Sequence, residues 1–237
     1  MKIRSWLAPL AIAATLGSAA AVADAQARRP AAKAAARDWT RTVVVTPQGG
    51  FRMGNPNAQV KLVEYGSLTC PACANFSTGA KGKLEAHVRS GKVSFEFRNF
   101  VLNGVDAAAA LLSRCAGPSG FFRLTESFYA TQPQWLGKMS GLTQAQKDAI
   151  GAAPEAQRLK RAADAAGLTP LAVKWGLPLA RANACLADRA ALERLAKMYE
   201  AGAQAGVNHT PSFFINGQEV HAHDWAELQP LIRKAGG

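Results

Sequence analysis

One short stretch, Ser67 to Phe76 (SLTCPACANF), constrains the fold of this chain more than any other. Two cysteines, Cys70 and Cys73, stand one helical turn apart in it, with a proline between them. The preceding residues 58–65 (AQVKLVEY) alternate and then become almost continuously apolar, which is typical of a buried strand. The residues after Cys70 predict a helix that continues to about Arg89. The first cysteine is therefore expected where a buried strand has ended and a helix begins.

A C-x-x-C pair has three physical uses: binding a metal, closing a structural disulfide, or exchanging disulfides. A structural zinc site needs four ligands, usually from a second C-x-x-C or a pair of spaced histidines. The chain offers neither, because His221 and His223 form a lone pair and Cys115 and Cys185 stand singly. A structural disulfide within the C-x-x-C would close a very small ring and gain little from chain entropy. Redox exchange is the preferred interpretation, and the other two remain alternatives.

The predicted position of the first cysteine favours redox exchange. At the start of a helix, the sulfur of Cys70 faces unpaired N–H groups and the positive end of the helix dipole, and both favour a thiolate. Pro71 suits the first helical turn because it has no N–H to leave unsatisfied. Cys73, one turn later, can attack a mixed disulfide on Cys70 and release the product. We therefore predict Cys70 as the nucleophile and Cys73 as the resolving cysteine.

Glu64 lies near the end of the apolar strand that precedes the cysteines. A carboxylate buried in such a strand is costly unless it is paired or has a chemical role. Beneath the dithiol, Glu64 could accept or relay the proton of Cys73 during resolution. The alternative is a glutamate at the end of a strand that points to solvent.

A second candidate segment is Val207 to Pro211 (VNHTP), which precedes a predicted strand at residues 212–215. A proline at this place is often only a rigid turn. The bond between Thr210 and Pro211 can also be cis, since X-Pro is the common cis peptide. A cis bond would point the backbone of Thr210 outward, where it could pair with an extended substrate strand. His209 is interpreted as a loop residue, with an electrostatic role near the sulfurs as the alternative.

Residues 1–27 have the order of a secretory signal peptide: basic residues, an apolar run and then small residues before an A-x-A pattern. We expect cleavage between residues 23 and 27; a membrane anchor is the alternative, but the apolar run is shorter than the roughly 20 residues that span a bilayer. The formal net charge of +12 becomes +11 when Lys2, Arg4 and Asp24 are removed. The charges are scattered, so a basic surface without nucleic-acid binding is expected.

The rest of the chain predicts one α/β domain interrupted by helices. Residues 28–40 look like a linker, residues 41–45 and 92–100 like strands, and residues 49–57 contain turn signals. From Asp106 to about Glu200 the chain is rich in alanine and leucine and predicts four to six helices. Asn216 and Gly217 then predict a hairpin turn, followed by a return strand to His221 and a helix over residues 225–234, capped by Asp224. The predicted units are residues 41–105 with 206–237, and an inserted helical subdomain at residues 106–205.

In this order and with these motifs, the chain resembles the periplasmic thiol-disulfide oxidoreductases of the DsbA type over about residues 54–234. The most specific segments are VKLVEYGSLTCPAC, FRNF and TPSFFINGQ. The resemblance implies a thioredoxin-like fold with an inserted helical subdomain beside a peptide-binding groove. It implies Cys70 as the exposed attacking cysteine, Cys73 as the resolving one, and Glu64 as a buried acid below them. Thr210 and Pro211 match the loop that binds substrate beside the thiols.

One residue departs from the pattern. Strong oxidants of this family usually carry histidine before the second cysteine, and this chain has Ala72. The missing donor leaves the direction of net electron flow open. The preferred interpretation is a periplasmic oxidant that acts on reduced or misoxidised secreted proteins, is reoxidised by a membrane partner of the DsbB type, and works as a monomer without cofactor or metal. A reductase or isomerase is one alternative, and a peptide-binding module with a vestigial dithiol is another.

Cys115 and Cys185 both fall in the predicted helical subdomain, seventy residues apart. Export to an oxidising compartment favours a structural disulfide between them. Such a bridge would be worth about 4 kcal/mol from the loss of chain entropy. The alternative is that both are free thiols packed as small core residues.

Overall fold

The computed structural model describes residues 37–237. The predicted signal peptide and residues 28–36 of the predicted linker lie outside the described residues. A short 3₁₀ turn, Trp39–Arg41, precedes the first strand. None of the helices within residues 37–237 is long and apolar enough to cross a membrane.

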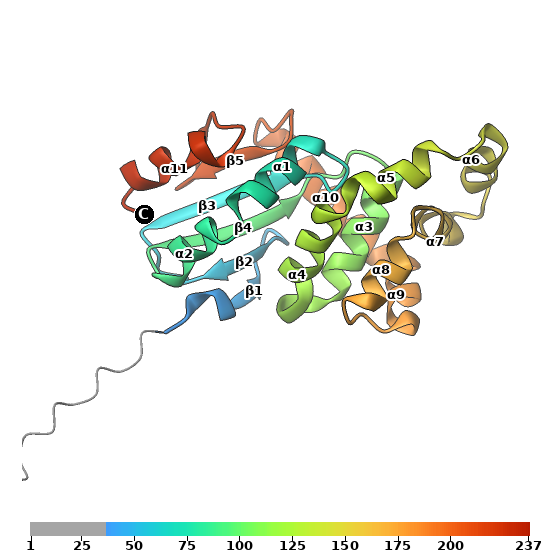
Figure 1. The fold of residues 1–237 in the computed structure, drawn as a ribbon, viewed down its shortest axis with the longest axis horizontal. Coiled ribbons are helices and arrows are strands. Elements are labelled where there is room, and N and C mark those ends of the chain that lie inside the picture. The colour runs from blue at the N-terminus through green and yellow to red at the C-terminus, as the bar shows by residue number, and fades with distance from the viewer. Residues whose placement is uncertain (1–36) are drawn as a thin grey trace, which may run out of the picture. The chain divides into compact units, whose positions relative to one another are not determined.

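A mixed sheet of six strands forms the centre of the described residues, in the order β1-β2-β4-β3-β5-β6 (Figure 1). The central strands β3 and β4 are parallel, and every other neighbouring pair is antiparallel. This mixed sheet and its helices confirm the predicted α/β fold class. The strands are β1 (Val43–Val45), β2 (Phe51–Gly54), β3 (Val60–Gly66), β4 (Val93–Asn99), β5 (Ser212–Ile215) and β6 (Gln218–Val220).

The sequence interpretation noted turn signals at residues 49–57 and missed the strand that this segment contains. Four of these residues form β2, which pairs with both β1 and β4. Phe51 and Met53 alternate inward and are buried, so the strand contributes to the core. Turn residues flank β2 closely on both sides. The segment forms a strand in spite of them, because it pairs with β4, which is distant in the sequence. The first strand also begins at Val43, two residues later than predicted.

The single helix predicted to continue to about Arg89 is two helices, α1 (Pro71–Ala80) and α2 (Lys83–Arg89). The break falls at Lys81, which leaves the helical region, and at Gly82, whose φ is 64°. A positive φ is a conformation that glycine adopts without steric cost. Gly82 therefore supplied a local signal for the break.

The section predicted as four to six helices contains eight helices between residues 104 and 204. The number was underestimated because the helices are short and their connections are tight: Gly167 alone, with φ 76°, separates α7 from α8. The boundaries of the insertion, residues 106–205, stay an interpretation. The helices are α3 (Gly104–Cys115), α4 (Gly117–Ala130), α5 (Gln132–Ser140), α6 (Gln144–Gly151), α7 (Glu155–Ala166), α8 (Leu168–Lys174), α9 (Leu179–Leu186) and α10 (Arg189–Gln204).

Helices cover both faces of the sheet, and β3 points alternate side chains into the two layers. In Figure 1, α1 and α2 lie in front of the sheet, while α10 passes behind it. Glu64 faces the layer of α1 and α4 and lines a pocket between them. Its neighbour Tyr65 faces the opposite layer, where it lies against Gly202 of α10. The strand thus carries one acidic side chain into the layer that holds the cysteines.

The C-terminal hairpin and helix follow the prediction. Asn216 and Gly217 both have positive φ, 53° and 83°, as a two-residue hairpin turn requires. The last helix is α11 (Trp225–Lys234). Asp224 caps its start, and the side chain of Asp224 accepts a hydrogen bond from the N–H of Glu227.

Candidate active site

Cys70 is the N-cap residue of α1, at the end of the loop that follows β3. Its backbone is extended, with φ −81° and ψ 120°, and Pro71 occupies the first helical turn. The sulfur is half-buried and donates a hydrogen bond to the backbone oxygen of Thr210, with an Sγ–O distance of 3.2 Å. The strand–cysteine–helix arrangement expected from the sequence is therefore present.

The surroundings of Cys70 lower the pKa of its thiol from 9.0 to about 5. The largest cause is a hydrogen bond from the side chain of Cys73, and the side chain of Thr210 and the backbone N–H groups of Cys73 and Ala72 lower the pKa further. Partial burial acts in the opposite direction. Donors at the start of a helix stabilise the thiolate more than burial disfavours it, so Cys70 is ionised at neutral pH.

Cys73 lies in the opposite kind of environment. Its side chain is fully buried, and neither Cys73 nor Cys70 is in a disulfide in this structure. Burial raises the pKa of Cys73 well above 9, helped by its hydrogen bond to Cys70 and by the charge of Glu64. One sulfur of the pair is therefore accessible and ionised, and the other is buried and protonated.

Glu64 is buried beneath the dithiol, with 3% of its surface exposed, so it does not point to solvent. Burial, followed by the charge of Cys70, raises its pKa to about 8. Its Oε1 atom has no hydrogen-bond partner within residues 37–237. A carboxyl group with this pKa can hold or release a proton near neutral pH.

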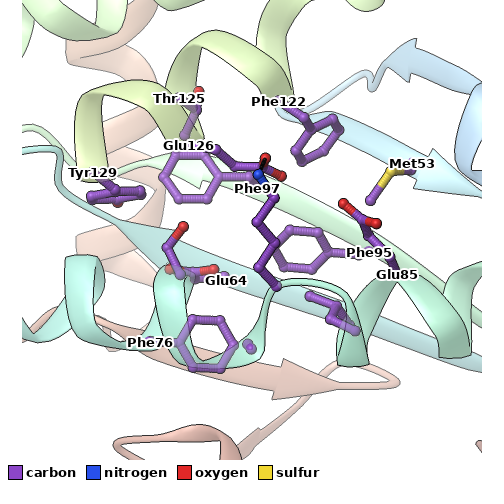
Figure 2. A pocket seen from close by; sticks show the side chains of 14 residues that line it. Met53, Glu64, Phe76, Glu85, Phe95, Phe97, Phe122, Thr125, Glu126 and Tyr129 are labelled. Carbon is purple, nitrogen blue, oxygen red and sulfur yellow. Dashed lines mark ion pairs between the residues drawn. The ribbon is translucent and has the colours of Figure 1, made fainter. Parts of the chain in front are cut away.

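Glu64 lines a pocket between the sheet and helices α1 and α4 (Figure 2). The pocket holds about 470 Å³ of space outside the atoms, part of it open to solvent. Five of its fourteen lining residues are aromatic, and Thr125 adds a second buried oxygen that lacks a partner among the described residues. Lys81 and Glu126 also line the pocket and form an ion pair, with an Nζ–Oε2 distance of 3.0 Å. Glu64 therefore lies against a space that water can reach.

The structure places Thr210 and Pro211 beside the cysteines, and the bond between them is cis. The loop is held by Ser212, whose hydroxyl donates to the backbone oxygen of His209 at 2.9 Å. His209 itself is exposed, and its ring contacts the side chain of Asn208, with an Nδ1–Oδ1 distance of 2.8 Å. This position agrees with the interpretation of His209 as a loop residue.

Three buried residues at this site were not predicted as supports of the reactive loop: Asp106, Tyr129, which the sequence indicated only as a core aromatic or part of a peptide groove, and Gln132. All three come from the helical section, and all bind the loop between β3 and α1. Asp106 accepts hydrogen bonds from the N–H of Leu68 (2.8 Å) and the hydroxyl of Ser67 (2.6 Å). The hydroxyl of Tyr129 donates to the backbone oxygen of Ser67 at 3.1 Å. The spacing of the motifs carried no signal for these contacts, because they join segments far apart in the sequence.

Cys115 and Cys185 form a disulfide, with their Cα atoms 6.1 Å apart. The bond joins the end of α3 to α9. It lies within the helical section, as the sequence interpretation placed it. No group of three or more histidine, cysteine, aspartate or glutamate side chains is arranged to hold a metal ion anywhere in the described part of the chain.

Proteins of known structure share this fold. A protein-disulfide isomerase of known structure from Novosphingobium aromaticivorans is 34% identical, covers 78% of this chain and 97% of its own, and superposes with a TM-score of 0.73. The structure of alpha-DsbA1 from Wolbachia pipientis superposes with a TM-score of 0.62 at 20% identity, with 81% of this chain and 93% of its own covered. This second similarity shows the fold alone.

A curated protein of Rickettsia prowazekii, named as a candidate protein-disulfide oxidoreductase, is 24% identical over 188 residues. The match covers 77% of this chain but only 60% of that relative. A family model described as thioredoxin matches residues 46–234, which is well over half of the chain. The chain therefore belongs to the thioredoxin family, and its fold is similar to that of the DsbA1 structure.

Proposed function

We propose that this protein is a thiol-disulfide oxidoreductase that exchanges disulfides with exported proteins through Cys70 and Cys73. The observation that carries the proposal is the contrast between the two sulfurs. Cys70 is half-exposed with a pKa of about 5, whereas Cys73 is buried with a raised pKa. An ionised, accessible sulfur can attack or leave, and a buried one can resolve the mixed disulfide without reacting at random.

In the oxidising direction, a substrate thiolate attacks the sulfur of Cys70 in the Cys70–Cys73 disulfide. The bond between the two cysteines breaks, Cys73 leaves, and Cys70 is joined to the substrate. A second substrate thiolate then attacks the substrate sulfur of this mixed disulfide, and Cys70 leaves as a thiolate. The substrate loses two electrons and two protons and gains a disulfide, and the enzyme retains the two electrons as a dithiol.

Glu64 supplies the proton that this scheme requires. Cys73 leaves as a thiolate, but its raised pKa means that it takes up a proton at neutral pH. The carboxyl group of Glu64, with a pKa of about 8, is protonated at pH 7 and can donate that proton. In the reverse reaction, the carboxylate of Glu64 accepts the proton from Cys73 as that cysteine attacks. The partly open pocket beside Glu64 is the route by which a proton from solvent would recharge it.

An oxidising role in the periplasm agrees with the low pKa of Cys70. A stabilised thiolate stabilises the reduced form of the enzyme, which makes its disulfide a stronger oxidant. Residues 1–27, with the pattern of a signal peptide, support export. A membrane partner of the DsbB type would then remove the two electrons, and the substrates would be reduced secreted proteins.

Isomerase activity is the second candidate. The relative from Novosphingobium aromaticivorans is described as a protein-disulfide isomerase. Ala72 lacks the side-chain donor that histidine would offer to the thiolate at this place. An isomerase acts through its reduced form, so the ionised Cys70 of the dithiol would attack wrongly paired disulfides directly.

Trapping tests the exchange itself. In a Cys73→Ala variant, mixed disulfides on Cys70 cannot be resolved and should accumulate with exported proteins. The double variant Cys70→Ala, Cys73→Ala is the matched control and should trap none. If the single variant traps no more protein than the double variant, the proposed exchange is wrong.

The redox potential of the Cys70–Cys73 pair separates the two candidates. Equilibration with glutathione buffers, followed by quantification of both forms, gives this value. A potential near the roughly −120 mV of DsbA supports the oxidant. A potential near the roughly −180 mV of protein disulfide isomerase, together with reactivation of a scrambled test protein, supports the isomerase.

A further inference from the structure

Gln132 links the helical insertion directly to the backbone of the reactive cysteine. It is the first residue of α5, and its side chain is buried with 3% of its surface exposed. Its amide nitrogen Nε2 donates hydrogen bonds to two backbone oxygens, that of Leu68 at 2.7 Å and that of Cys70 at 2.9 Å. Both partners are acceptors, so only the NH₂ group of the amide can make these contacts.

The hydrogen bond from Gln132 to Cys70 is made where the backbone enters α1. The oxygen of Cys70 also accepts from the N–H of Ala74 at 3.2 Å, which is the first hydrogen bond of α1. Gln132 therefore holds the peptide group through which the loop enters the helix. The orientation of this group determines whether the sulfur of Cys70 faces the N–H groups of the first helical turn.

The other two anchors of the loop act farther from the sulfur. Tyr129 binds the oxygen of Ser67, and Asp106 binds Ser67 and Leu68. Among residues 37–237, Gln132 is the side chain that donates a hydrogen bond to the backbone of Cys70 itself. The three anchors thus fix the same loop, but one of them also fixes the reactive residue.

We propose that Gln132 is a positioning residue that holds the backbone of Cys70 so that its sulfur meets the donors at the start of α1. The inference deepens the proposed function, since it assumes that the reactivity of this sulfur matters. Gln132 is a neutral donor, so it fixes the loop without adding charge near Glu64 and Asp106, the two acids that respond to the charge of Cys70. Through this contact, the helical insertion controls the reactivity of the thioredoxin-like site.

The variant Gln132→Met tests the proposal, because methionine is similar in length and flexibility but donates no hydrogen bond. The pKa of Cys70 is measured on the reduced protein from thiolate absorbance and from the pH dependence of alkylation. We expect it to rise by roughly half a unit to one unit, the size of the loss of one hydrogen bond. Gln134→Met is the matched control: Gln134 is exposed on the same helix, and its replacement should leave the pKa unchanged.

Tyr129→Phe separates positioning from stability. It removes one hydrogen bond from the same loop but leaves the backbone of Cys70 untouched. We expect this variant to lower the melting temperature while shifting the pKa of Cys70 less than Gln132→Met does. If Gln132→Met lowers the melting temperature and leaves the pKa of Cys70 at the wild-type value, Gln132 is only structural and the inference is wrong.

A variant of the same shape covers the case in which methionine prevents folding. In Gln132→Glu, burial against two carbonyl oxygens favours the protonated carboxyl group, which has one donor for two acceptors, so the pKa of Cys70 should rise less than in the methionine variant. An unchanged pKa in a folded Gln132→Glu protein overturns the inference. The proposed function is judged separately by the wild-type pKa, since a value near 9 would contradict it whatever the variants do.

Discussion

The four cysteines form two pairs of the same residue type in very different surroundings. Cys70 and Cys73 are one helical turn apart, free in this structure, and lie where a strand gives way to a helix. Cys115 and Cys185 are seventy residues apart and joined in a disulfide between two helices. The first pair sits among donors that ionise one sulfur, whereas the second pair links helices of the insertion. Local electrostatics therefore distinguish a reactive pair from a structural one.

A single helix connects the two pairs. α3 begins near Asp106, which binds the loop before Cys70, and ends at Cys115, which forms the bridge. The insertion is thus anchored by a covalent bond at one end of α3 and by hydrogen bonds to the active-site loop at the other. If the two pairs have separate roles, changes at each should affect different measurements.

The largest effect is expected for Cys70→Ser, which replaces the nucleophile with a hydroxyl that cannot form a disulfide. Exchange activity, measured as oxidation of a reduced test protein or reduction of insulin, should be lost completely. The free energy of unfolding should change little, because Cys70 is half-exposed and an N-cap position accepts serine well. Residual exchange above the uncatalysed rate would break the distinction between the two pairs.

Removal of the Cys115–Cys185 disulfide should lower stability and leave exchange activity almost unchanged. The double variant Cys115→Ala, Cys185→Ala should lose about 4 kcal/mol of unfolding free energy, the chain-entropy contribution for a loop of this length. Chemical denaturation at pH 7 measures the loss, with Cys70→Ser as the comparison. Exchange activity should stay close to wild type under conditions in which the variant is folded. A folded double variant without activity would show that the bridge also shapes the reactive site.

Glu64→Gln should stabilise the reduced protein at neutral pH. The gain would show that the buried carboxyl group beside the reactive pair lowers the free energy of unfolding, whereas the structural pair raises it. The pKa of Glu64 is about 8 in the folded protein, against an ordinary value of 4.5, so folding favours its protonated form. This contribution to stability is complete below pH 4.5 and is lost as the pH rises to 8. Relative to wild type, the glutamine variant should gain roughly 3 kcal/mol at pH 7 and nothing at pH 4.

Denaturation of the reduced proteins at pH 4 and pH 7 measures this difference. The oxidised proteins serve as the control, because the charge of Cys70 that helps to raise the pKa of Glu64 is then absent and the difference should shrink. Exchange should be slower in the variant, since glutamine cannot transfer a proton to or from Cys73. Equal stability of both reduced proteins at pH 7 would contradict a raised pKa for Glu64.

The reactive pair was predictable from the sequence because its environment is built locally. A buried strand, a cysteine and a helix start follow one another within residues 60–73, so the donors around Cys70, apart from Thr210, come from its own neighbours. Strand signals at β3, β4 and β5 and the turn at Asn216 were equally local. The thioredoxin-like fold could therefore be predicted from these segments and their resemblance to a known family.

The supports of the site could not be predicted, because they depend on contacts across the fold. Asp106 and Gln132 lie 38 and 64 residues from Leu68, which both of them bind. Nothing in the spacing of either residue indicates that the helices turn back onto this loop. β2 was missed for the same reason, since its pairing with β4 outweighs the turn residues around it. Sequence patterns indicate local structure, and these contacts arise only when distant segments pack.

Asp106→Asn is expected to have the smallest effect, and it tests how far the active-site loop depends on α3. The carboxylate of Asp106 accepts from the N–H groups of Leu68 and Leu102 and from the hydroxyl of Ser67. Asparagine has one acceptor oxygen and an NH₂ group, so a donor of the loop would face another donor. We expect a loss of about 1–2 kcal/mol in unfolding free energy, as for a buried group left without its partner.

The same variant should shift the alkylation profile of Cys70 only slightly, because Asp106 binds Ser67 and Leu68 and not the cysteine itself. Burial raises the pKa of Asp106 to about 6, so its carboxylate is present at pH 7 and largely protonated at pH 4.5. Because folding favours the protonated form of Asp106, its contribution to wild-type stability is lost as the pH rises from 3.8 through 6, so the stability difference between wild type and the non-titrating variant should be smaller at pH 7 than at pH 4.5. Asn103→Ala leaves Asp106 in place but removes the cap of α3 and a hydrogen bond to the hydroxyl of Thr69 in the same loop, so it shows how much of the effect comes from the start of α3 alone. A shift in the pKa of Cys70 as large as that of Gln132→Met would mean that α3 also positions the sulfur, and that the two cysteine pairs are coupled through this helix.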